Sequence, residues 1–263
     1  MIAYITRARA QQVLNPLSNS YTMSSLESGK GSDVVQHSKA TYKALETSPG
    51  EWKMGAMPVD PTQGFKAKEI QLLSFQRPHM RAFHFAWLSF FCAFVCWFAF
   101  APLMVLVRAD LNIPVSGVFT TNICSVLSTV MARFLVGPLC DKLGPKICQT
   151  VLLAWISVMT LVGMSVNSLW SLGVVRFLIG AGGGSFVVTQ FWTTQMFCSE
   201  IVGTANATTA GWGNLGGGVT QLLMVYVYSF FFNVVGLGSE AAWRVSFVAV
   251  SYTHLTLPTI LLV

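Results

Sequence analysis

A glycine-rich stretch near the C-terminal end of the chain surrounds a single amide side chain. Residues 210–218 read AGWGNLGGG, with five glycines in nine positions and Asn214 among them. Glycine costs about 1 kcal/mol relative to alanine in an aqueous helix. Inside a membrane, small residues let helices approach closely, and Gly213 and Gly217 form a G-x-x-x-G pair of that kind. We therefore expect a helix that a small solute passes at close range.

Asn214 is a candidate substrate contact within this stretch. Its amide can donate to an oxyanion, with Gly211 and Gly218 opening the wall around it and Gly213 as a further member of the substrate-binding set. The alternative is that Asn214 forms a hydrogen bond between helices, which is the commoner use of a single asparagine in a membrane. The surrounding glycines favour substrate contact.

Arg133 is the second candidate for substrate binding. It precedes Asp141 by eight residues, so a helix places it roughly 12 Å from the loop that follows. A guanidinium buried there costs a few kcal/mol and usually faces a cavity or a partner. No carboxylate lies at matching depth, so we expect the counter-ion to arrive from outside as a small oxyanion, which suits the planar donors of arginine. Snorkelling to the inner surface, or a bond to helix carbonyls, remains the alternative.

The composition indicates a polytopic membrane protein. Hydrophobic residues make up 53% of the 263 residues and charged residues only 10%, whereas soluble domains carry about 25% charged residues. Residues 1–81 hold ten Lys and Arg against six Asp and Glu. The positive-inside rule explains such a basic tail, so we do not expect nucleic-acid binding.

Six apolar stretches each approach the roughly 20 residues that a helix needs to cross a bilayer. Short loops join them, so consecutive helices should be antiparallel neighbours, and the expected fold is an all-α membrane protein. Lys142 and Lys146 should lie on the same side as the basic tail, which places the N-terminus in the cytosol. The expected spans are 83–107, 117–139, 147–166, 169–192, 203–228 and an incomplete sixth that begins near 243 and extends past 250.

The two ends of the chain differ from this six-span bundle at 76–250. Residues 1–75 are rich in Ser, Lys, Gly and Pro, which is typical of a disordered cytosolic tail, and either Met1 or Met23 could be the true start. At the other end, residues 250–259 read VSYTHLTLPT, a string that one reading frame of a common sequencing adaptor would encode. Our hypothesis is that residues 251–263 are an artefact, and the alternative is an unusual helix end.

The loop between the second and third spans carries a charged glycine motif. Residues 137–146 read GPLCDKLGPK, and the pattern G-x-x-x-D-K-x-G-x-K resembles the cytosolic loop signature of the major facilitator superfamily. We expect gating geometry here rather than substrate contact. Gly137 would permit close helix packing, Gly144 would make the turn, and Asp141 would accept hydrogen bonds at the gate. Lys142 and Lys146 would hold the loop at the inner face.

Arg176 opens a second glycine cluster in the fourth span. Residues 176–184 read RFLIGAGGG, and R-x-x-x-G recurs at this place in facilitator proteins. Arg176 could clamp a loop to helix ends or serve coupling, and both interpretations stay open. Gly180 and Gly182–Gly184 should let spans four and five approach closely. Gln190, Gln195, Thr193 and Thr194 should mostly form hydrogen bonds between helices.

Together these motifs resemble the nitrate/nitrite porter family, a branch of the major facilitator superfamily. AGWGNLGGG is similar to that family's nitrate signature in the fifth span, and its context, RFLIGAGGGSFVVTQFWTTQMF with VGTANATTAGWGNLGGGVTQLL, resembles the eukaryotic members. The resemblance covers residues 75 to 250. By position, Arg133 matches the family's nitrate-binding arginine of span two, and Asn214 matches the signature asparagine.

The resemblance implies the N-terminal six-helix half of a plasma-membrane carrier of nitrate, with nitrite left open as a further substrate. A second arginine and a second glycine signature would belong to a C-terminal half that this sequence does not hold. Eukaryotic members are regarded as proton symporters, yet the carboxylates Asp110, Asp141, Glu200 and Glu240 all fall at loops. Protons and an accessory membrane protein are therefore only possible partners, beside nitrate or nitrite and the lipid bilayer.

Three other interpretations remain. The protein could be a facilitator for another anion, a membrane nitrate sensor that signals through its tail, or a half that assembles with a separately encoded partner. An enzyme is not expected, since the sequence shows no nucleophile–base pair, metal cluster or phosphate loop, and no cofactor is expected. The six cysteines lie in or beside apolar spans, where we expect them to serve packing.

Overall fold

The computed structural model describes residues 57–262, with side chains described as far as Tyr252. Residues up to Phe65 and residues from Lys66 onward form two compact units. The described part of the first unit holds strand β1 (Val59–Asp60) and the 3₁₀ helix η2 (Pro61–Gln63). Asp60 caps η2 by accepting from the Thr62 backbone N–H at 2.9 Å. The expectation of disorder for residues 1–56 lies outside the described residues.

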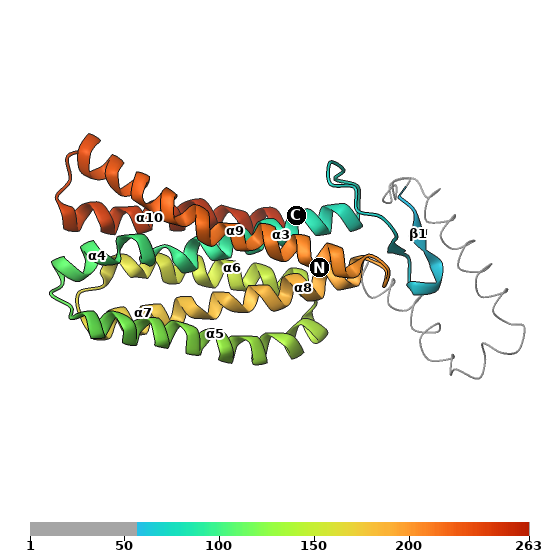
Figure 1. Ribbon diagram of the computed structural model, residues 1–263, viewed down its shortest axis with the longest axis horizontal. Coiled ribbons are helices and arrows are strands. Elements are labelled where there is room, and N and C mark those ends of the chain that lie inside the picture. The colour runs from blue at the N-terminus through green and yellow to red at the C-terminus, as the bar shows by residue number, and fades with distance from the viewer. Residues whose placement is uncertain (1–56, 263) are drawn as a thin grey trace, which may run out of the picture. The chain divides into compact units, whose positions relative to one another are not determined.

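The second unit is a bundle of long helices that lie along the horizontal axis of Figure 1, with successive spans running in opposite directions. We call the end that holds residues 66–80, 140–148 and 196–204 the proximal end, and the opposite end the distal end. After the short strand β2 (Lys66–Ala67), the α-helices are α3 (His79–Phe98), α4 (Phe100–Asp110), α5 (Val115–Leu143), α6 (Pro145–Val162), α7 (Leu169–Gly180), α8 (Ser185–Met196), α9 (Val202–Ser229) and α10 (Ser239–Leu262).

Five segments of the described chain are long and apolar enough to cross a membrane. They are His79–Asp110, Val115–Leu143, Pro145–Ser165, Leu169–Met196 and Val202–Val234. The first five predicted spans coincide with these segments, with ends that differ by a few residues, so the all-α membrane fold is confirmed. The sixth predicted span is present as α10 but is not among the five. The part of α10 whose side chains are described ends at Tyr252, which is shorter than the roughly 20 residues that a helix needs to cross a bilayer.

Helix α10 continues without a break from Ser239 to Leu262. It therefore includes residues 251–262, which our hypothesis assigns to a sequencing artefact. Helical structure is compatible with either origin of this stretch, and the hypothesis stays a prediction.

Several spans are interrupted where the sequence suggested one continuous helix. The first span breaks at Ala99, between α3 and α4. Pro102 follows there, and because proline has no backbone N–H it cannot complete the bond to the carbonyl four residues earlier. The fourth span passes through a 3₁₀ segment, η4 (Ala181–Gly184), between α7 and α8. The third ends in η3 (Gly163–Ser165), and the fifth ends in the π-helix η5 (Phe230–Val234).

An aromatic core and a polar clamp join α4 to α10 towards the distal end. The rings of Phe100 and Phe247 stack with centroids 4.2 Å apart, and both are fully buried. Asp110, the last residue of α4, accepts from Trp243 Nε1 at 2.8 Å and from Ser239 Oγ at 3.2 Å. These two donors fix the start of α10 to the end of the first span.

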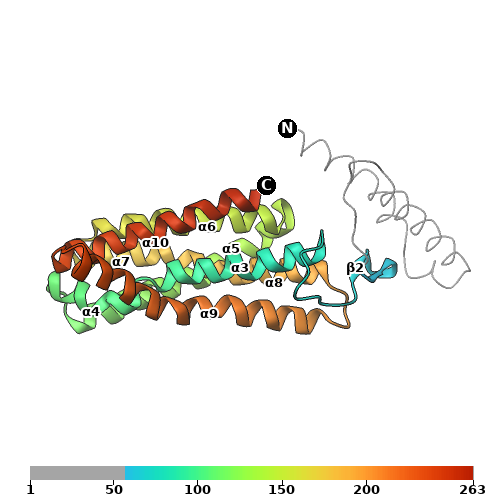
Figure 2. The same cartoon turned by 90° about the horizontal axis from the view of Figure 1, so that it is seen from above.

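A strap of residues 66–78 lies against the proximal end of the bundle. Ala67 pairs with Phe197 in a parallel β-bridge, and the Cys198 backbone N–H donates to the Ala67 carbonyl at 3.0 Å. Lys66 Nζ donates to the Thr194 carbonyl at 2.9 Å. The structure therefore gives part of the stretch expected to be a disordered tail a defined place on the connection between α8 and α9. Figure 2 shows α3 in the middle of the bundle, between α9 and α10.

Candidate functional site

One face of α9 packs tightly against α3 through glycines. A Cβ built at Gly216 would stand 2.2 Å from the Phe91 backbone oxygen, and one at Gly213 would stand 1.8 Å from a ring carbon of Phe90. Real Cβ atoms do not approach so closely, so any larger residue would force α9 away from α3. The sequence placed Gly213 in the substrate-binding set. The structure buries it in this helix seam, which agrees with the predicted close packing of the G-x-x-x-G pair and does not test substrate contact.

The opposite face of α9 is open. Gly211, Asn214 and Gly218 are all exposed, and they share one stripe of the helix because they are spaced by three and four residues. A Cβ built at Gly211 or Gly218 would meet no atom within 4 Å. Asn214 makes no hydrogen bond within the part of the chain that the structure describes, so it does not tie α9 to another of these helices. Its amide and the bare backbone beside it remain accessible.

Arg133 lies exposed on α5 and leans towards the start of α8. Its guanidinium carbon lies 5.3 Å from the centroid of the Phe186 ring. Its Nε is 3.4 Å from the Gly183 carbonyl oxygen, which is at the long limit for an N–H···O bond. Among the described residues, no carboxylate lies within salt-bridge distance of Arg133. The sequence predicted a buried charge, with snorkelling or a bond to a helix carbonyl as the alternatives. The structure shows an exposed side chain with one long contact to a helix carbonyl.

Aromatic rings connect Arg133 to the glycine stretch of α9. The Phe186 ring beneath Arg133 lies 5.7 Å from the ring of Phe90 on α3, and Phe90 fills the space beside Gly213. The two predicted candidates therefore stand on different helices, joined through α8 and α3 rather than by direct contact. Sequence reasoning did not single out Phe90 or Phe186. The crowding of aromatic residues in the first span was the available signal.

Arg176 is half-buried on α7, and within the described residues it has neither a hydrogen bond nor an ion pair. The sequence predicted that the glycines after Arg176 bring the fourth span close to α9. The structure shows other partners. Built Cβ atoms would stand 2.2 Å from the Ser125 backbone oxygen at Gly180 and 2.1 Å from Ile156 at Gly182. These glycines therefore bring η4 against α5 and α6. Thr129 Oγ1 strengthens this contact by donating to the Gly180 carbonyl at 2.7 Å.

Hydrogen bonds between α8 and α9 agree with the prediction for the polar residues of the fourth span. Gln190 Nε2 donates to the Asn206 carbonyl at 3.3 Å, and Asn206 Nδ2 donates to Thr194 Oγ1 at 2.9 Å. Thr193 Oγ1 lies 3.4 Å from Thr209 Oγ1. These residues hold the two helices together at the proximal end.

The loop motif at 137–146 forms a tight turn between α5 and α6. Gly144 has φ of +83°, a conformation that favours glycine, so the predicted turn position is confirmed. Asp141, Lys142 and Lys146 are exposed. Gly137 was expected to permit close helix packing, but a Cβ there would meet no atom within 4 Å, so the structure shows no such contact.

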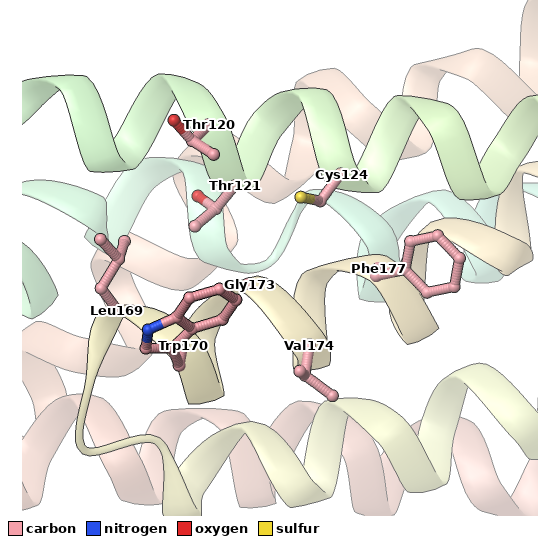
Figure 3. Close-up of a pocket in the computed structure, with 8 residues that line it drawn as sticks. All are labelled: Thr120, Thr121, Cys124, Leu169, Trp170, Gly173, Val174 and Phe177. Atoms are coloured by element: carbon pink, nitrogen blue, oxygen red, sulfur yellow. The ribbon is translucent and has the colours of Figure 1, made fainter.

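A groove between α5 and α7 lies nearer the distal end (Figure 3). Its volume is about 350 Å³ and its wall is largely apolar. It includes none of the predicted site residues, and an apolar wall offers few donors to an oxyanion. Its lining residues are Thr120, Thr121, Cys124, Leu169, Trp170, Gly173, Val174 and Phe177.

Comparison with known proteins gives one family match and several similar transporters. Residues 86–263 match the Major Facilitator Superfamily. The chain is 41% identical to High affinity nitrate transporter 2.5 of Arabidopsis thaliana, over 73% of this chain and 38% of that protein. It is 36% identical to Nitrate transporter 2.2 of Chlamydomonas reinhardtii, over 69% and 35% respectively. It is 32% identical to Nitrate/nitrite transporter NrtP of Nostoc punctiforme, over 63% of this chain and 33% of that protein. The chain thus spans about a third to two fifths of the length of these relatives.

Proposed function

Because this chain belongs to the major facilitator superfamily and is a multi-pass membrane protein, we propose that it serves the transport of nitrate by alternating access. In such transporters two helical halves enclose a site near the middle of the membrane and rock around it. The described bundle corresponds to one half. The names of its relatives support nitrate as the substrate, with nitrite as a second one.

The observation that carries the proposal is the exposed guanidinium of Arg133. An arginine side chain held in the hydrocarbon region is costly unless it faces a partner or a water-filled cavity. Arg133 has no carboxylate partner among the described residues, and its planar donors match the geometry of a planar oxyanion. Nitrate would lose hydration water on entering the site, and charge-assisted hydrogen bonds from Arg133 would offset that loss.

Asn214 would supply a second, neutral donor from α9. Its amide stands on the open stripe with Gly211 and Gly218, where the absence of side chains leaves room for a solute against the backbone. A surface facing α5 and α9, supplied from outside this chain, would close the other side of the site with a further arginine.

The loop motif and Arg176 would serve the conformational cycle rather than binding. Asp141, Lys142 and Lys146 are exposed around the turn at Gly144, where they can meet a facing half as a gate. Arg176 lies within a span without an anionic partner in the described chain, which favours a role in coupling. A plasma-membrane location with the N-terminus in the cytosol, proton symport and an accessory membrane protein complete the proposal.

The test is nitrate uptake by cells that express the complete open reading frame with Arg133→Lys. Lysine keeps the positive charge but loses the planar fork, so uptake should fall on the order of 100-fold. Arg108→Lys is the matched control, because Arg108 Nε donates to the Ile113 carbonyl at the distal end and uptake should persist. Retained uptake in the Arg133 variant would count against nitrate recognition by this residue. Nitrate binding without uptake in the unaltered protein would indicate a sensor instead.

A further inference from the structure

His84 stands at the proximal end of α3 with both ring nitrogens engaged. Its Nε2 lies 3.0 Å from the Ser74 carbonyl oxygen of the strap. Its Nδ1 receives the indole N–H of Trp87, with Nε1 to Nδ1 at 3.1 Å. The ring of Phe75 stacks on the imidazole at 4.3 Å, and His84 is only 6% exposed.

These two partners fix the protonation state of the imidazole. An indole nitrogen can only donate, so Nδ1 must offer a lone pair. A carbonyl can only accept, so Nε2 must carry the hydrogen. His84 is therefore a neutral imidazole with its proton on Nε2. A second proton could bind only at Nδ1, where it would meet the Trp87 N–H head-on and end that hydrogen bond.

Trp87 connects this histidine to the glycine stretch of α9. Its ring packs edge-to-face against Trp212, with centroids 5.3 Å apart, and Phe83 packs against the same Trp212 at 6.2 Å. Trp212 lies between Gly211 of the open face and Gly213 of the packed face. The orientation of Trp87 therefore bears directly on the helix that carries Asn214.

The charged groups around this cluster come from the strap, from α3 and from the neighbouring loops. Helix α9 carries no Asp, Glu, His, Lys or Arg between 202 and 229. Besides Trp87, the hydrogen-bond partner of His84 is the backbone carbonyl of Ser74. The guanidinium of Arg81 lies over the ring of Phe85 at 5.3 Å. Besides His84, the ionisable side chains of the strap, the first turn of α3 and the connection between α8 and α9 are Lys66, Lys68, Glu69, Arg77, His79, Arg81, Cys198 and Glu200, and Lys146 lies at the start of α6.

We propose that His84 is a proton-accepting positioning residue of this half. In its neutral form it holds Trp87 against Trp212. A proton delivered by water at the proximal end adds to Nδ1, gives an imidazolium with one more positive charge, and releases the Trp87 indole. Among the described residues of the five spans, the only carboxylates, Asp110 and Asp141, lie at span ends. The imidazole of His84 is a titratable group that reaches the candidate substrate helix through the ring of Trp87. The role of this protonation in transport rests on the proposed function, whereas the protonation of His84 itself does not.

The first experiment follows the tryptophan indole N–H signals by nuclear magnetic resonance between about pH 5 and 8. The full protein is placed in lipid nanodiscs, and Trp87→Phe and Trp212→Phe assign the two signals. We expect both signals to move together with one midpoint. In His84→Asn, whose side-chain oxygen can still accept from Trp87 but does not titrate in this range, both movements should be lost. His79→Asn is the matched control on the same helix, and there both should persist.

Two results would overturn the proposal: movements that survive in His84→Asn, or signals that stay fixed in the unaltered protein. Should His84→Asn fail to fold, Trp87→Phe answers the same question, because Trp212 should then no longer respond to pH. A separate uptake assay varies internal pH, and His84→Asn should flatten the pH dependence of nitrate uptake. If the unaltered protein transports no nitrate but the indole signals titrate, the proposed function fails and the proton switch stands.

Discussion

The two faces of α9 share one glycine-rich sequence but do opposite things. On one face Gly213 and Gly216 lie so close to α3 that no Cβ would fit. On the other face Gly211 and Gly218 meet nothing within 4 Å, and Asn214 stands exposed between them. Within AGWGNLGGG, position along the helix decides which glycine is needed for assembly and which leaves backbone accessible.

This difference shows why a signature motif cannot be assigned to one role as a block. Substitutions on the packed face should disturb folding and leave the chemistry of binding intact. Substitutions on the open face should disturb binding and leave folding intact. Measuring stability and nitrate binding on the same variants separates the two faces.

The largest effect should come from Gly216→Ala. Its Cβ would stand 2.2 Å from the Phe91 backbone oxygen, and backbone cannot move aside as a side-chain tip can, so we expect about 1–3 kcal/mol of lost stability. Denaturant or thermal unfolding of the purified protein measures this loss. Gly218→Ala is the matched control. It should be neutral or gain up to about 1 kcal/mol, because alanine is the better helix former. Equal losses in both variants would remove the distinction between the faces.

A smaller effect should follow from Asn214→Ala on the open face. Stability should stay within about 0.5 kcal/mol of the unaltered protein, since Asn214 has no partner among the described residues. The loss of one hydrogen bond to a charged ligand should weaken nitrate binding about tenfold, as measured by calorimetry. Gln221→Ala is the control, because Gln221 is exposed on the same helix and contacts only its own helix carbonyl at Gly217. A loss of stability without a loss of binding would move Asn214 to a packing role.

The smallest effect should come from Thr220→Val on the packed face. Thr220 Oγ1 lies 2.6 Å from the Gly216 carbonyl and 3.4 Å from the Val95 carbonyl of α3. Valine keeps the shape and removes the hydroxyl, so stability should fall by about 1 kcal/mol with nitrate binding unchanged. Thr208→Val offers a control, since that hydroxyl bonds only within α9, to the Thr204 carbonyl. An equal cost in both variants would show that the contact with α3 adds nothing.

The order of the spans could be predicted from apolar length, but their interruptions could not. The first span is apolar on both sides of Ala99, so hydropathy alone gives no sign of the break beside Pro102. The glycine pattern at Gly180 and Gly182–Gly184 predicts close packing. The structure is needed to show that the partners are α5 and α6 rather than α9.

The candidate site was predictable in its residue types and less so in its geometry. Arg133 and Asn214 were found because a charge and an amide are unusual in apolar helices. The packing of Gly213 was predictable from its G-x-x-x-G spacing, but its partner Phe90 on α3 was not. The strap escaped notice because the bridge between Ala67 and Phe197 joins residues 130 positions apart, with no local pattern to mark it.

The fastenings at the two ends of the bundle have a mechanical consequence. At the distal end Asp110 accepts hydrogen bonds from Trp243 and Ser239. At the proximal end Ala67 of the strap pairs with the connection between α8 and α9. If the bundle moves in alternating access as proposed, contacts at both of its ends should make it move as one body. Relative motion should then occur at the outer surfaces of α5 and α9, where this bundle would contact the facing half.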